Sequence, residues 1–125
     1  MDKPKCLLTF KEDSLFGAGL QRLIASQSDL EVVLASVASL QDVLQVVERE
    51  QPRVVVFDTL CVEKNQELVS RVLAQPGVLR VIVVGYEESL IQVYDRYHVR
   101  VREITDFISA IYSRTGPLAD HKEGA

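Results

Sequence analysis

Short apolar runs alternate with amphipathic stretches along most of the chain. The runs are rich in Val, Leu and Ile and lack polar alternation, so they predict strands buried on both faces. Between them, apolar residues recur every three or four positions, which is the helical period. The predicted strands are 5–10, 30–35, 53–58, 81–84 and 99–101. The predicted helices are 14–24, 39–51, 66–74, 89–97 and 105–113.

Residues typical of helix ends support these boundaries. Residues that favour N-caps begin three of the predicted helices: Ser14, Ser39 and Thr105. Pro52 stops the second helix, because proline cannot donate the backbone hydrogen bond a helix needs. Gly17 and Gly19 are expected to weaken the first helix by about 1 kcal/mol each relative to Ala if they are exposed.

Five consecutive strand–helix units predict an α/β fold with a parallel sheet covered by helices on both faces. Right-handed crossovers leave few topologies, and the flavodoxin-like three-layer (βα)5 sandwich with strand order 2-1-3-4-5 suits this size. The expectation is one domain over residues 1–114, followed by a flexible tail or linker over 115–125. This order places strands 5–10 and 53–58 side by side.

Composition narrows the class of protein. The 125 residues carry a net charge of −4, and no basic stripe favours nucleic acid. Cys6 and Cys61 sit in or beside strand ends, where we interpret them as reduced packing residues. There is no signal-peptide pattern, and the apolar runs are far shorter than the ~20 residues of a membrane span, so we expect a cytoplasmic protein.

Carboxylates follow two of the predicted strands. Asp58 ends the apolar run 54–57, and Lys11, Glu12 and Asp13 follow the first strand. In open parallel sheets, ligands gather at the carboxyl ends of the strands. The pattern therefore favours phosphoryl or metal chemistry at that edge.

The stretch 14–24 (Ser-Leu-Phe-Gly-Ala-Gly-Leu-Gln-Arg-Leu-Ile) and the strand–helix–strand pattern of 29–58 resemble the receiver domain of two-component response regulators. The resemblance covers roughly 5–113 and is nearest to receivers attached to helix-turn-helix transcription regulators. It implies phosphorelay signal transduction.

In that family the aspartate ending the third strand is the phosphoacceptor, and Asp58 matches it. A carboxylate of this kind attacks a phosphoryl group and forms an acyl phosphate. The family's acidic pair, which holds Mg²⁺, aligns with Lys11 and Glu12, with Asp13 just beyond. The resemblance thus implies a weak Mg²⁺ site formed by Glu12, Asp13 and Asp58, with Lys11 replacing part of the metal's charge.

Other family positions are altered. Gly85 stands where a Ser or Thr normally bonds the phosphoryl oxygen, and Arg102, with Arg100 as a second candidate, replaces the phosphate-pairing Lys. Arginine keeps the charge but changes the geometry. Glu103 replaces the Pro that follows this Lys. The chain therefore resembles an atypical, or pseudo-, receiver.

Plainer interpretations exist for the same residues. Asp58 can cap the turn after its strand, and Glu12 and Asp13 can favour a helix N-terminus through the helix dipole. Arg102 can be a surface cation. Four tyrosines on or near the last two helices suggest either core edge or a contact surface: Tyr86, Tyr94, Tyr97 and Tyr112.

The expected function is signalling by protein contact, without normal phosphorylation and without enzymatic activity. No glycine-rich dinucleotide motif or P-loop is present. The resemblance implies a kinase, an output domain or a second copy as partner, at the face of the fourth helix, fifth strand and fifth helix. The alternatives are a phosphorylatable receiver with Asp58 as Mg²⁺-dependent acceptor and, more weakly, a small-molecule sensor.

Overall fold

The computed structural model describes residues 4–10, 14–27, 29–37, 39–85, 90–95, 99–103 and 107–112. The strands are β1 (Lys5–Leu8), β2 (Glu31–Leu34), β3 (Val54–Asp58), β4 (Arg80–Val84), β5 (Leu90–Asp95) and β6 (Val99–Glu103). The helices are α1 (Leu15–Gln27), α2 (Leu40–Glu50), α3 (Thr59–Lys64), α4 (Leu68–Leu73) and α5 (Phe107–Tyr112).

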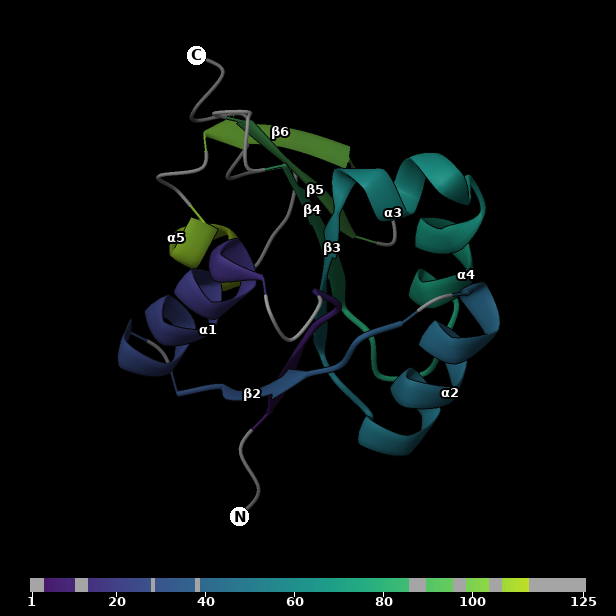
Figure 1. Cartoon of the computed structure of the whole chain (residues 1–125), viewed down its shortest axis with the longest axis horizontal. Helices are drawn as coiled ribbons and strands as arrows, with labels where there is room; N and C mark the ends of the chain where they lie inside the picture. The colour runs from purple at the N-terminus through teal and green to yellow at the C-terminus, as the bar shows by residue number, and fades with distance from the viewer. Residues whose placement is uncertain are drawn as a thin grey trace.

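The strands form one sheet in the order β2-β1-β3-β4-β5-β6. β1, β2, β3 and β4 are mutually parallel. Helices α1 and α5 lie on one side of the sheet and α2, α3 and α4 on the other, which gives three layers (Figure 1). The α/β class and the order 2-1-3-4 of the first four strands are confirmed.

The all-parallel (βα)5 prediction is wrong beyond β4. The segment predicted as a helix over 89–97 contains β5, which pairs antiparallel with β4, and β6 pairs antiparallel with β5. Ile91 and Val93 are fully buried while Gln92 is exposed, which is the two-residue period of a strand. Apolar residues at 90, 94 and 97 also fit a helix, and such short runs are ambiguous by periodicity alone.

The predicted helix 66–74 is also only partly correct. The chain instead forms α3 directly after β3 and the shorter α4, and the α3 segment was not predicted as a helix. The two N-caps within the described part are confirmed: Ser14 Oγ accepts from Gly17 N at 3.0 Å, and Ser39 Oγ accepts from Asp42 N at 3.1 Å. The predicted cap Thr105 and the tail 115–125 lie outside the described residues.

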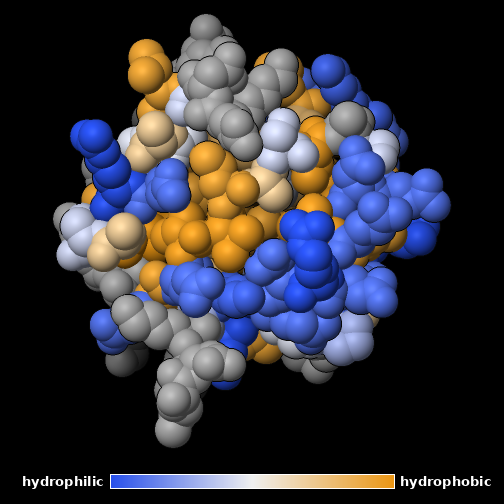
Figure 2. Space-filling model, turned by 60° about the horizontal axis from the view of Figure 1, so that its bottom comes forward, coloured by the Kyte–Doolittle hydropathy of each residue, from blue (hydrophilic) through white to orange (hydrophobic). Residues whose placement is uncertain are grey.

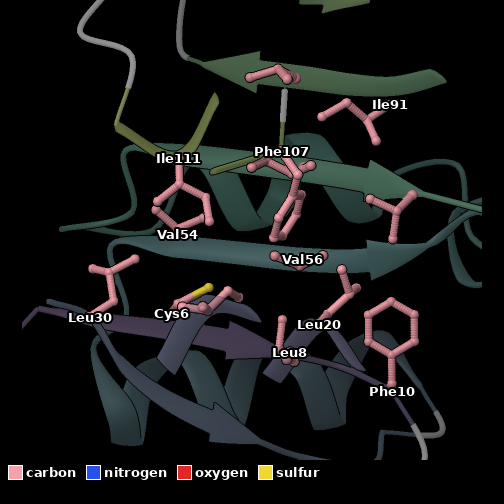
Figure 3. Packing of buried hydrophobic residues seen from close by; sticks show 14 residues of the cluster. Cys6, Leu8, Phe10, Leu20, Leu30, Val54, Val56, Ile91, Phe107 and Ile111 are labelled. Carbon is pink, nitrogen blue, oxygen red and sulfur yellow. The ribbon is translucent and has the colours of Figure 1, made fainter. Parts of the chain in front are cut away.

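The core on the α1 and α5 side joins every strand from β1 to β5. Phe107 and Ile111 of α5 lie over Val54 and Val56 of β3 (Figure 3), and Ile91 belongs to the same cluster. Phe10 packs edge-on against Phe16 of α1, with ring centroids 5.7 Å apart. The C-terminal helix is therefore an integral part of this core.

The core on the other side joins Leu7, Val55 and Phe57 of the sheet to α2 and α4. Lys5 Nζ lies 3.1 Å from Glu50 Oε1 and so ties the start of β1 to the end of α2. Hydrogen bonding to Lys5, then to Arg49, lowers the pKa of Glu50.

Among the helices of the described residues, none has the length and apolar character that a membrane crossing requires.

Candidate functional site

Asp58 ends β3 and begins α3. Its neighbour Phe57 is fully buried, whereas Asp58 is partly exposed because it emerges from the carboxyl edge of the sheet. Asp58 Oδ1 accepts a hydrogen bond from Leu60 N at 2.9 Å, with Asp58 as the N-cap of α3. The carboxylate therefore satisfies an amide that has no partner within the helix.

The end of β1 lies beside this position. Leu8 pairs with Val56 in the register, and Thr9 extends the pairing because both its backbone N and its Oγ1 donate to Val56 O, at 3.1 Å and 3.0 Å. Thr9 therefore lies at the same edge of the sheet as Asp58. Lys11, Glu12 and Asp13, the predicted metal and charge residues, lie outside the described residues.

Gly85 follows β4 at this edge, since Val84 pairs directly with Asp58. It is partly exposed and offers no side-chain donor. The position predicted to lack the family hydroxyl therefore lies next to the strand that carries Asp58.

The antiparallel strand β5 lies between β4 and β6, so Arg102 is further from Asp58 than in the predicted topology. Asp58 pairs with Val84, and Ile91 pairs with Arg102, so the four residues form one row across the sheet when the β4–β5 register is continued by one residue. Arg102 is on the third strand from β3, which puts its Cα about 14 Å from that of Asp58. The Arg102 and Arg100 side chains lie outside the described residues.

Cys61 is a titratable residue whose pKa is changed by Asp58. Burial first, and then the negative charge of Asp58, raise the pKa of the Cys61 thiol above its ordinary 9.0, while Lys64 opposes the change. Burial raises the pKa of Cys6 to about 12. Both cysteines are free, and both therefore favour the thiol, which is a poor nucleophile and metal ligand.

We expect Asp58→Asn to lower the pKa of Cys61, because the thiolate loses a repelling neighbour, and Lys64→Gln to raise it. The pH dependence of iodoacetamide alkylation measures both, and Cys6 does not interfere because it is fully buried. Shifts in the same direction for the two variants would contradict this electrostatic coupling.

Among the described residues, no group of three or more His, Cys, Asp or Glu side chains could hold a metal ion. No Lys, Arg or His of that same part pairs with the Asp58 carboxylate. Within the described residues, the Asp58 carboxylate caps α3, and its negative charge disfavours the thiolate form of Cys61.

Arg80 was not singled out from the sequence. It is buried at the start of β4, and its Nη1 donates to Ile111 O in α5 at 3.1 Å. A cation at the carbonyl end of a helix is favourable, so Arg80 holds α5 against the sheet. The sequence feature that could have pointed to Arg80 is the position of a charged residue directly before the apolar run 81–84.

No family model, curated protein or solved structure matches the chain.

Proposed function

We propose that this chain is an atypical receiver-like domain that acts in signal transduction through protein contacts and without normal phosphorylation. The observation that carries the proposal is the role of Asp58. It occupies the carboxyl end of the third strand in an order of 2-1-3-4, as in flavodoxin-like receivers, yet its carboxylate caps α3. The position thus resembles a phosphoacceptor while its described contacts are structural.

The surroundings of Asp58 further support a role without phosphorylation. A phosphoryl group needs donors and cations around its oxygens. Gly85 supplies no hydroxyl, and the extra strand β5 sets the backbone of Arg102 about 14 Å from Asp58.

The face expected to bind a partner is built from different secondary-structure elements than predicted. The prediction included a helix over 89–97 in this face. The described residues Leu90–Asp95 form the strand β5 instead, which pairs with β4 and β6. Tyr94 of β5 is half-buried, with its hydroxyl 3.1 Å from Gln92 Oε1. The proposed contact surface is accordingly the end of the sheet formed by β5 and β6, on the face that carries Tyr94.

The test is incubation with Mg²⁺ and acetyl phosphate, followed by intact mass, on wild type, Asp58→Asn and Asp58→Ala. We expect no phosphoryl adduct on any of them. Asp58→Asn should keep its stability, because Asn is an equally good N-cap, while Asp58→Ala should lose about 1 kcal/mol in urea unfolding.

An adduct on the wild type that Asp58→Asn abolishes would instead establish the alternative function. In that case Asp58 takes the phosphoryl group, Glu12 and Asp13 hold Mg²⁺, and Lys11 or Arg102 supplies the missing cation.

A further inference from the structure

α3 is a short helix with little packing to stabilise it. It has six residues, and none of them is buried. Cys61 and Val62 pack only partly against the core on the α2 side, and Leu60 is 55% exposed. Helices this short are not stable alone and depend on packing of an apolar face. α3 therefore relies on the bonds at its ends.

Asp58 provides the side-chain cap of α3. Its Oδ1 accepts from Leu60 N at 2.9 Å, and at the other end Asn65 N donates to Val62 O at 3.1 Å. The N–H groups of the first turn have no partner within a helix, and the first turn is a large part of a six-residue helix. Loss of the Asp58 bond would therefore affect much of α3.

The residues on either side of α3 are anchored. Phe57 of β3 is fully buried, and Leu68 of α4 is 1% exposed. β3 also pairs with β4 as far as Asp58, which lies opposite Val84. The segment 59–66 can therefore open between two fixed points as a local unit, without breaking the sheet or α4.

α2 has a similar cap but depends on it less. Ser39 Oγ accepts from Asp42 N at 3.1 Å. α2 has eleven residues, and three of them are buried in the core: Val43, Val46 and Val47. Loss of the Ser39 cap would lower the stability of the whole protein, but packing would keep α2 in place. α3 has no comparable packing, so its folding depends on Asp58.

We propose that α3 is a conformational switch controlled by the Asp58 carboxylate. α3 is folded while Oδ1 accepts from Leu60 N, and 59–66 opens when that bond is lost. A group that bonds the carboxylate in place of Leu60 N would open α3 by its preference for the open state. This inference deepens the proposed function, on whose contact surface it rests, because Tyr94 packs against the same core cluster as Val62.

Amide hydrogen exchange of the full chain, read by NMR without Mg²⁺ or a phosphoryl donor, measures the opening. In the wild type, the amides of Glu63 and Lys64 in α3 should be protected, but less than those of β3, because local opening costs less than global unfolding. Asp58→Ala should lower this protection about fivefold, which corresponds to a lost N-cap of about 1 kcal/mol. Asp58→Asn loses the same charge but keeps a capping side chain, so its protection should stay near that of the wild type.

Ser39→Ala is the matched control. It removes a cap of similar strength, but it destabilises the folded protein and the form with α3 open equally, so protection in α3 should not change. Equal losses of α3 protection in Ser39→Ala and Asp58→Ala would overturn the proposal, because α3 would then open only with the whole protein. Wild-type α3 amides that are unprotected, or as protected as those of β3, would also overturn it.

Alkylation of Cys61 gives a second measurement. Asp58→Asn and Asp58→Ala remove the same charge, so the electrostatic change in the pKa of the thiol is common to both, and the variants differ in the cap. At one pH, Cys61 should react faster in Asp58→Ala, because opening exposes a thiol that is partly buried. Equal rates would contradict the switch but leave the proposed function standing, since the acetyl phosphate test does not depend on α3.

An apolar area elsewhere on the molecule calls for one more control. Figure 2 brings forward the bottom of the molecule and shows a continuous apolar area at its centre, whereas α3 lies near the top of Figure 1. Exposed apolar areas can mediate association between molecules. Exchange is therefore measured at two protein concentrations, and protection in α3 should be the same at both. Protection that rises with concentration would mean that association controls α3, and would contradict the proposal.

Discussion

Phe107→Ala is expected to lower the free energy of unfolding by about 3–5 kcal/mol, as for other buried Phe truncations. The side chain is 1% exposed and packs over the centre of the sheet in the cluster that includes Val54, Val56 and Ile91. Truncation removes apolar contacts and leaves a cavity between α5 and the sheet. Since domains of this size are stable by about 5–15 kcal/mol, the loss would be a large fraction of the total.

Urea unfolding followed by circular dichroism measures this loss. Leu79→Ala is the matched control, because Leu79 is 55% exposed and its truncation should change stability by only about 0.5 kcal/mol or less. If Phe107→Ala were as mild as Leu79→Ala, α5 would not be docked on the sheet as the structure has it.

Gly17→Ala is expected to destabilise the protein by about 1–3 kcal/mol although alanine is the better helix former. A Cβ at Gly17 would lie 2.7 Å from Phe10 Cβ and 3.2 Å from Phe10 Cγ. A contact with Cβ cannot be relieved by rotating the ring, so α1 would have to move away from the end of β1. The same urea experiment measures the cost.

Gly19→Ala provides the opposite expectation in the same helix. A Cβ there would meet nothing within 4 Å, so the substitution should stabilise the protein by about 0.5–1 kcal/mol. The pair therefore separates helix propensity, which favours alanine at both positions, from packing, which forbids it at one. Equal stabilisation by both substitutions would mean that α1 and Phe10 are not in this close contact.

The effects expected at Gly17 and Gly19 show what helix propensity alone cannot predict. Both were expected to weaken the first helix, and that prediction treats them alike. Only the structure distinguishes them, because Phe10 lies two residues after the end of β1 and its distance from α1 depends on how the helix packs.

The position of Asp58 in the fold could be predicted from the sequence, but its distance from the other predicted site residues could not. Its position at the end of β3 follows from the apolar run before it, and its capping role follows from residue type. Its separation from Arg102 does not, because that separation depends on the number and direction of the strands after β4. Whether residues 89–97 form a helix or a strand is a matter of tertiary packing when both periods fit.

The sequence by itself determined the first four strands, the two capped helices α1 and α2 and the α/β class. Those segments have strong periodicity and local caps, which act within a few residues of one another. The tertiary structure decided the antiparallel β5 and β6, the separate α3 and α4, the close approach at Gly17 and the anchoring of α5 by Arg80. Each of these depends on contacts between residues distant in the chain, and local patterns carry no information about such distances.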